Sequence, residues 1–347
     1  MTDHRLLEAK LESLFAYMTG DHKGRWGMDI EQWDWVPGVG IVSIMAYGKR
    51  TGSEPVIRYV REWAERNKEK AGGAKVINAM APFAVFPELY RLTREERYLK
   101  QSEEIVRWMM NEAPRTREGA LEHTVTESVQ FREQAWADTV YMAVLLIARH
   151  AGLTGDRAAA AEALRQTMLH LRLLQEPETG VLFHGWNCEA GDHMSAVRWT
   201  RANAWIALAV PEIVEEIGGL VDIPEELHGR YAALAKGLLS YRAAGGLWHT
   251  VLDRPDFYKE SSGSAGIACG FVKAARIGLV DPSYAASALL TVEGLLPLIR
   301  ANGEVAGVSG GTPVMESAEA YNRIKTYPTL YGQGLTMQLL TEALAIE

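Results

Sequence analysis

An aspartate set among apolar and aromatic residues is the feature of this sequence that could do acid/base chemistry. Asp138 lies within the segment 134–142, next to Ala137 and close to Val140. An aspartate near the start of a helix can simply cap the helix or interact with its dipole. Burial among apolar neighbours would instead raise the pKa of the carboxyl group and let it hold a proton near neutral pH. Asp138 is therefore our candidate general acid/base.

Two histidines could assist this acid, although each could also be purely structural. His123 and His184 lie on either side of Asp138 in the sequence. The sequence contains no pair of histidines at helical metal-binding spacing, and the two cysteines, Cys188 and Cys269, cannot form a zinc-binding thiol cluster. We therefore expect neither a metal nor another cofactor.

A guanidinium and two indoles lie close together, at Arg201, Trp199 and Trp205. Arg201 could hold a carboxylate through two parallel hydrogen bonds, and the indoles offer flat apolar surfaces that suit sugar faces. The alternative is a tryptophan-rich core helix with a surface arginine. Six of the ten tryptophans fall at the same expected end of the fold, which favours a sugar site: Trp33, Trp35, Trp136, Trp186, Trp199 and Trp205.

Helices must position these residues, because apolar residues recur with helical spacing along the whole chain. Amphipathic stretches rich in charge predict outer helices near 3–18, 54–68, 95–111, 156–174, 225–242 and 282–300. Mostly apolar stretches predict inner helices near 36–49, 77–91, 134–150, 201–217, 263–278 and 331–345. This alternation predicts an all-α fold, an (α/α)6 barrel of six helical hairpins, with residues 1–347 as a single catalytic domain.

The connections between these helices are of two lengths. Short links from an inner to an outer helix contain Gly52, Thr93, Gly155, Pro224 and Pro282. The long return connections are rich in glycine, proline, histidine, tryptophan and charged residues, and they span 111–133, 175–200, 243–262 and 300–330. They lead into the N-termini of the inner helices, whose N–H groups favour an anion. We expect a cavity for an acidic sugar or another small anion there, unless the loops merely cap the ring.

Composition excludes several classes of protein. With 48% apolar residues the chain can bury a large core, and its net charge of −8 argues against a nucleic-acid surface. No apolar run approaches the roughly twenty residues that span a bilayer. Charged residues such as Asp3 and Glu8 interrupt the first eighteen residues, unlike in a signal peptide. We expect a cytoplasmic protein without a membrane or nucleic-acid partner, either a monomer or a weak homodimer.

Several motifs resemble one known family. The segments that carry the resemblance are 136–142, 184–186, 199–205, 258–262, 309–312 and 331–334. They are similar to glycoside hydrolase family 105, the unsaturated rhamnogalacturonyl hydrolases, which are related to the family 88 unsaturated glucuronyl hydrolases. The similarity keeps the order and spacing of the motifs and covers nearly the whole chain.

The resemblance implies a substrate and a reaction. Such enzymes act on oligosaccharides whose non-reducing end is a uronic acid with a C4=C5 double bond. An aspartate protonates C4, water adds at C5, and the resulting hemiketal opens and expels the neighbouring sugar. Asp138 matches that aspartate. The residues that the resemblance implies for substrate binding are Trp35, Asn78, His123, Trp136, His184, Trp199, Arg201 and Trp205.

Three questions stay open at this point. Asn78 stands where relatives often carry an aspartate, and an amide cannot share or relay a proton. The sugar could be an unsaturated galacturonyl unit of rhamnogalacturonan oligosaccharides or a glucuronyl unit. A sugar 2-epimerase-like isomerase uses a similar ring with a pair of histidines, and His123 and His184 leave this alternative open, as they do a binding protein with an inactive pocket.

Overall fold

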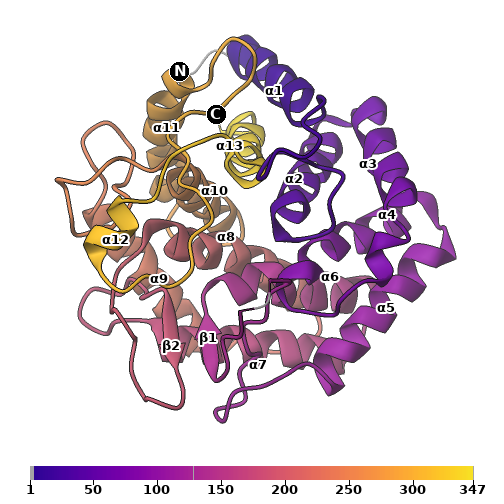
Figure 1. Cartoon of the computed structure of the whole chain (residues 1–347), viewed down its shortest axis with the longest axis horizontal. Helices are drawn as coiled ribbons and strands as arrows, with labels where there is room; N and C mark the ends of the chain where they lie inside the picture. Colours follow the sequence, from indigo (N-terminus) through magenta and orange to yellow (C-terminus); the bar gives the residue numbers. More distant parts are fainter. Residues whose placement is uncertain (1–3, 128, 347) are drawn as a thin grey trace.

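The computed structural model describes residues 4–127 and 129–346, and its helices form a ring of hairpins (Figure 1). The outer helices are α1 (His4–Met18), α3 (Glu54–Arg66), α5 (Glu96–Asn111), α7 (Arg157–Leu174), α9 (Glu225–Ser240) and α11 (Ser283–Leu295). The inner elements are α2 (Trp35–Thr51), η2 (Asn78–Val85) with α4 (Phe86–Thr93), η3 (Val140–Val144) with α6 (Leu145–Thr154), α8 (Thr200–Ile217), α10 (Ser261–Arg276) and α13 (Leu330–Ala343). The expected all-α (α/α)6 barrel is confirmed.

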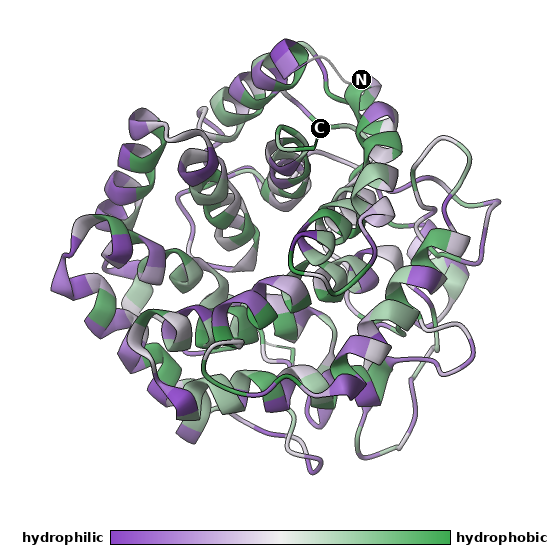
Figure 2. Ribbon diagram, turned by 180° about the vertical axis from the view of Figure 1, so that it is seen from behind, coloured by the Kyte–Doolittle hydropathy of each residue, from purple (hydrophilic) through white to green (hydrophobic). Residues whose placement is uncertain are grey.

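The inner elements close on themselves. Going round the ring, α2 packs on η2, η2 on α6, α6 on α8, α8 on α10, α10 on α13, and α13 on α2 again. Outer helices cover them, for example α7 on α6 and α11 on α10, and hydrophilic residues lie along these outer helices in Figure 2. Surrounded on all sides, the inner helices are mostly apolar. Among the described residues no helix is both long and apolar enough to cross a membrane.

The short links lie where we expected them, at the C-terminal ends of the inner helices. Gly52 and Gly155 end α2 and α6 with φ angles of 64° and 75°, a left-handed conformation that glycine adopts without steric cost. Asp156 then caps α7 by accepting hydrogen bonds from the N–H groups of Ala158 and Ala159, at 2.9 and 3.1 Å. The long connections therefore gather at the other end, where the inner helices begin.

The second inner segment, expected as a regular helix over 77–91, begins as a 3-10 helix. Pro82 lies inside η2, and a proline has no N–H to donate to an α-helical ladder. Regular α-helix starts only at Phe86. Asn78 is thus held at the first position of a tighter helix, at the end of the ring where the long connections lie.

The third inner segment, expected as a helix over 134–150, also differs. Its first residues form the strand β1 (Gln134–Trp136), which pairs antiparallel with β2 (Gly185–Asn187) from the next long connection. Helical geometry begins at Asp138 and passes through the π-helix η3 before α6. Single π-helical turns are rare and often occur at functional sites.

Ion pairs join the inner helices at the end opposite the long connections. Glu212 of α8 accepts a hydrogen bond from Arg149 of α6 at 2.7 Å and forms an ion pair with Lys273 of α10. Glu88 of α4 pairs with Lys49 of α2. Burial acts to raise the pKa of Glu212, but the two cations outweigh it and lower that pKa to about 2. These ion pairs connect neighbouring inner helices at the end of the ring that is away from the long connections.

Candidate active site

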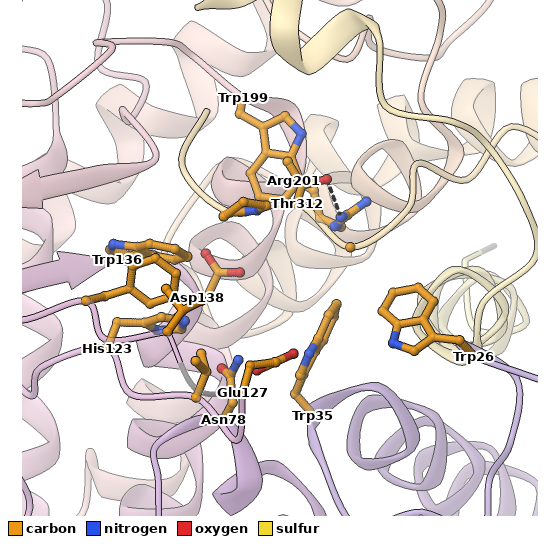
Figure 3. Close-up of a pocket in the computed structure, with 15 residues that line it drawn as sticks. Trp26, Trp35, Asn78, His123, Glu127, Trp136, Asp138, Trp199, Arg201 and Thr312 are labelled. Atoms are coloured by element: carbon orange, nitrogen blue, oxygen red, sulfur yellow. Dashed lines mark hydrogen bonds between the residues drawn. The ribbon is translucent and has the colours of Figure 1, made fainter. Parts of the chain in front are cut away.

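The N-terminal ends of the inner helices surround a cavity of about 260 Å³ (Figure 3). This is close to the lower limit of roughly 300 Å³ that is usual for small-molecule sites. The cavity therefore lies at the end of the barrel where the sequence predicted it. Its lining residues are Trp26, Trp35, Asn78, His123, Val125, Glu127, Val129, Phe131, Trp136, Asp138, Trp199, Arg201, Gly311, Thr312 and Pro313.

Asp138 follows β1, and its carboxylate faces the open cavity in Figure 3. The preceding residue, Ala137, donates its N–H to the carbonyl of His184 at 3.1 Å, so the strand pairing brings these two segments together. The side chain of Asp138 is 14% exposed, and its Oδ2 lies 3.2 Å from Nε2 of His184. The pair does not form a straight hydrogen bond in this state. Such contacts often tighten only when substrate binds.

The expectation that burial raises the pKa of Asp138 is wrong for the free site. Burial does act in that direction, but the contact with His184 and the nearby His123 and Arg201 outweigh it. The net effect lowers the pKa of Asp138 below its ordinary value of 3.8. Asp138 is therefore a carboxylate near neutral pH when the cavity is empty.

His184 lies behind Asp138 and away from the open cavity. Burial is the main cause that lowers its pKa, so the imidazole is neutral near pH 7. Its second ring nitrogen, Nδ1, lies 2.7 Å from the phenol oxygen of Tyr321. Tyr321 belongs to the short helix α12 (Ala318–Asn322), which lies in the connection 300–330. We did not single it out from the sequence, since nothing marks one tyrosine in a long loop.

His123 belongs to an aromatic wall beside Asp138. Its ring stacks on that of Trp136 with centroids 4.3 Å apart and planes 12° from parallel. The ring of Phe131 lies 4.4 Å from that of Trp136 and 6.2 Å from that of His123, centroid to centroid. Nδ1 of His123 lies 3.1 Å from the hydroxyl of Thr139. Burial lowers the pKa of His123 to about 4, so this histidine is also neutral near pH 7.

Arg201 lines the cavity, but its terminal nitrogens already have partners. They donate to the carbonyl oxygens of Ser309 and Gly310, at 3.0 and 2.8 Å, and more weakly to the hydroxyl of Thr312 at 3.4 Å. Arg201 therefore holds the loop 309–312 against the cavity. With these bonds in place, the terminal nitrogens are not free for the two parallel bonds that we expected to a substrate carboxylate.

The surroundings of Arg201 explain how a buried cation is tolerated here. The guanidinium lies 4.5 Å from the ring of Trp199 and 4.6 Å from that of Tyr331, within the distance of a cation–π contact. Oε1 of Glu260 is 3.8 Å away. Glu260 is itself fixed, because it caps α10 and accepts the N–H of Ser309 at 2.9 Å. Arg201, Glu260 and the loop thus form one rigid unit.

The opposite wall comes from the first two inner helices. Trp35 stacks on Tyr331 with centroids 4.9 Å apart, and Asp34 caps the helix that carries Trp35. Oδ1 of Asn78 is buried and has no hydrogen-bond partner within the described part of the chain. Because an unpaired buried oxygen is costly, Asn78 offers a ready acceptor to a hydroxyl group in the cavity.

The structure brings together most of the residues singled out from the sequence. Trp35, Asn78, His123, Trp136, Asp138, Trp199 and Arg201 line the cavity, and His184 touches Asp138 from behind. Trp205 does not line it, because its ring is fully buried and packs 5.0 Å from Tyr141. Two rim residues escaped notice, Trp26 and Glu127, since both lie in loops without a recognisable pattern.

The (α/α)6 ring holds an aromatic cavity with Asp138 at its floor, a neutral His123 in its lining and a neutral His184 behind Asp138, an arrangement that suits an enzyme acting on carbohydrates. The model of Glycosyl Hydrolase Family 88 matches residues 14–346. The chain is also 32% identical to the unsaturated rhamnogalacturonyl hydrolase YesR of Bacillus subtilis, over 90% of both chains. The chain therefore belongs to Glycosyl Hydrolase Family 88, and its identity to YesR agrees with the resemblance to the unsaturated rhamnogalacturonyl hydrolases that the sequence motifs indicated.

Solved structures agree with this assignment. A possible member of the GH105 family from Salmonella enterica serovar Paratyphi A is 30% identical, with a TM-score of 0.93 over 99% of this chain and 95% of that one. The unsaturated glucuronyl hydrolase of a Bacillus species is 16% identical, with a TM-score of 0.74 over 97% and 96% of the two chains. At that identity, the second likeness supports the fold alone.

Proposed function

We propose that this glycoside hydrolase releases a 4,5-unsaturated uronic acid from an oligosaccharide by adding water across the C4=C5 bond. One observation carries the proposal: Asp138 is the one carboxylate at the floor of the cavity within the described residues, and a neutral His184 lies behind it. The other carboxylate of the lining, Glu127, is exposed at the rim. Direct cleavage at the anomeric carbon normally uses two carboxylates that flank the scissile bond.

The reaction requires Asp138 to gain a proton before it can act as an acid. In the free site the carboxylate is ionised. A bound uronate brings a second negative charge close to it, which raises the pKa of Asp138 and couples its protonation to binding. Asp138 then gives the proton to C4 and takes one from the water that attacks C5. The hemiketal at C5 opens, and the neighbouring sugar leaves.

The other residues of the cavity would bind the sugar. Trp35 provides a flat apolar surface, the nearly buried Trp199 forms part of the cavity lining, and Oδ1 of Asn78 can accept a bond from a hydroxyl group. We propose that Arg201 attracts the uronate through its charge and keeps Thr312 at the wall, rather than through a bidentate contact. Trp205 would support this wall from beneath.

The sugar that we propose is an unsaturated galacturonyl unit of rhamnogalacturonan oligosaccharides. This proposal is supported by the 32% sequence identity between this chain and the unsaturated rhamnogalacturonyl hydrolase YesR of Bacillus subtilis, over 90% of both chains. The glucuronyl counterpart is the natural comparison. Galacturonate and glucuronate differ only at C4, and the C4=C5 double bond removes that stereocentre, so the two substrates share the unsaturated uronate and differ in the glycosidic linkage and the neighbouring sugar.

The experiment follows the absorbance of the conjugated double bond while the enzyme acts on each unsaturated disaccharide, without added metal or nucleotide. We expect the absorbance to fall as the neighbouring sugar is released, and faster with the galacturonyl substrate. A saturated disaccharide of the same sugars is the control and should not react. If the absorbance persists while free saturated sugars isomerise, the protein is an isomerase and the proposal is wrong.

A further inference from the structure

We infer that Tyr321 is a positioning residue: it fixes the tautomer of His184 and thereby directs an N–H group at the carboxylate of Asp138. The inference deepens the proposed function, since it rests on Asp138 as the acid/base. Tyr321 comes from α12, far from Asp138 in the sequence, and its ring is fully buried beside those of His184 and Trp199.

The first step concerns the number of protons on His184. Because burial lowers the pKa of His184, its ring is neutral near pH 7 and carries one N–H. One ring nitrogen must donate and the other must accept. The two nitrogens face different partners, Nδ1 the phenol oxygen of Tyr321 at 2.7 Å and Nε2 the carboxylate of Asp138 at 3.2 Å.

The second step concerns the direction of the bond from Tyr321. Its phenol oxygen already accepts the backbone N–H of Met315 at 3.2 Å. Burial raises the pKa of Tyr321, so the phenol keeps its proton. That O–H can donate to Nδ1 of His184, which leaves the proton of the ring on Nε2, opposite Asp138. Met315 then donates to Tyr321 and Tyr321 to His184, and the Nε2 proton of His184 lies on the side of Asp138, 3.2 Å from its carboxylate oxygen.

The tautomer of His184 with its proton on Nδ1 is unfavourable at both ring nitrogens. It would turn the lone pair of Nε2 toward an ionised carboxylate, and it would place an N–H at Nδ1 against the phenol. Tyr321 would then have to turn its own proton away from His184 and toward Ser195, whose hydroxyl makes no hydrogen bond within the described part of the chain. The arrangement therefore favours a proton on Nε2, where it stabilises the ionised form of Asp138 and fixes the orientation of its carboxylate.

Tyr321→Phe tests this role, because it removes the phenol oxygen and keeps the ring. We expect kcat to fall about tenfold or more, as for other changes that misplace a catalytic proton, while KM stays within about threefold. The loss of a fixed N–H donor raises the pKa of Asp138, so the falling limb of the pH profile should move to higher pH. Tyr231→Phe is the matched control, a buried tyrosine whose hydroxyl donates to the carbonyls of Ala207 and Gly270. It should leave the pH profile unchanged.

A direct readout does not depend on activity. In nitrogen-15 NMR of the wild-type protein, assigned by comparison with His184→Gln, we expect the ring proton of His184 on Nε2. In Tyr321→Phe we expect a mixture of tautomers. A wild-type proton on Nδ1 would overturn the inference even if the variant did not fold, and so would an unchanged tautomer together with an unchanged pH profile in the variant. If Asp138→Asn stayed active, the acid/base assignment would fail, whereas the NMR result would still report on Tyr321.

Discussion

At the scale of single residues, the chemistry of the site follows from how its buried groups share protons. His123 and His184 are neutral because burial disfavours their charged forms, whereas Asp138 stays ionised because the surrounding groups outweigh its burial. The free enzyme therefore holds its acid in the wrong protonation state for transfer to C4. Binding of the uronate must therefore raise the pKa of Asp138 and so promote its protonation.

This account predicts a distinct pH dependence. Only protonated Asp138 can act as the acid, and its pKa lies below 3.8 in the free enzyme. We therefore expect kcat/KM to fall by about tenfold per unit as the pH rises through the mildly acidic range. The falling limb of the pH profile of kcat should lie at higher pH than that of kcat/KM, since the bound uronate raises the pKa of Asp138. Rates measured across this range with the unsaturated disaccharide check both limbs, and a kcat/KM that increases with pH would contradict the account.

The catalytic role of Asp138 could be predicted from the sequence, but its protonation state could not. Asp138 was recognisable from its apolar neighbours and from the family motif, but those neighbours alone suggested a raised pKa. The groups that reverse the effect come from other parts of the chain, His184 across the strand pairing and Arg201 from the next inner helix. Tyr321 had no local signal at all, because its role exists only through a contact with His184, 137 residues away.

At the scale of elements, the loop 309–312 is the part of the site whose position depends most on one side chain. Arg201 binds two of its carbonyl oxygens, and Gly311 lies so close to the ring of Trp26 that a Cβ atom there would meet it at 2.8 Å. The loop therefore fits between a buried cation on one side and a rim indole on the other.

Arg201→Lys tests whether the positive charge of Arg201 or its hydrogen bonds to the loop 309–312 matter for substrate binding. Lysine keeps the positive charge but lacks the planar fork that binds two carbonyl groups. We expect KM to rise about tenfold or more in both Arg201→Lys and Arg201→Ala, equivalent to about 1.4 kcal/mol. The control is Arg198→Lys, which changes an arginine paired with Glu176 and Asp253 outside the cavity and should leave KM unchanged. A normal KM in Arg201→Lys alone would mean that charge is sufficient.

Elements were predictable where helical periodicity is regular. Most outer helices begin and end within a few residues of the expected bounds, since their charged and apolar faces alternate clearly. The inner segments at 77–91 and 134–150 were less predictable. Pro82 and the π-helix at Val140–Val144 interrupt them, and the strand β1 depends on a partner more than forty residues away. A purely local pattern contains no information about that partner.

At the scale of the whole molecule, the two ends of the ring have different tasks. One end holds the cavity, and the other is joined by ion pairs that link α4 to α8, α6 to α8 and α8 to α10. Removing one member of such a network leaves an opposite charge buried without its partner, which is strongly destabilising. The stability of the ring should therefore depend on pH through these carboxylates and independently of the cavity.

Glu212→Gln tests this dependence. The pKa of Glu212 is lowered to about 2, so its contribution is present above its ordinary value of 4.5 and is lost as the pH falls toward 2. We expect a loss of roughly 3–5 kcal/mol in the free energy of unfolding at pH 7, and a smaller difference from wild type at pH 3. Glu226→Gln is the control, an exposed carboxylate with a similarly low pKa, and should cost less than about 1 kcal/mol. Equal losses at both pH values would refute the assignment.

The most direct test of the central claim compares Asp138→Asn with the wild-type enzyme on the unsaturated galacturonyl disaccharide. The measurement records, in the same reaction, the absorbance of the double bond and the release of the neighbouring sugar, with substrate binding followed by calorimetry. We predict that both signals change together in the wild type, and that Asp138→Asn stays folded and binds substrate without turnover. Turnover in Asp138→Asn above a few per cent of wild type, or sugar release while the absorbance persists, would contradict the account.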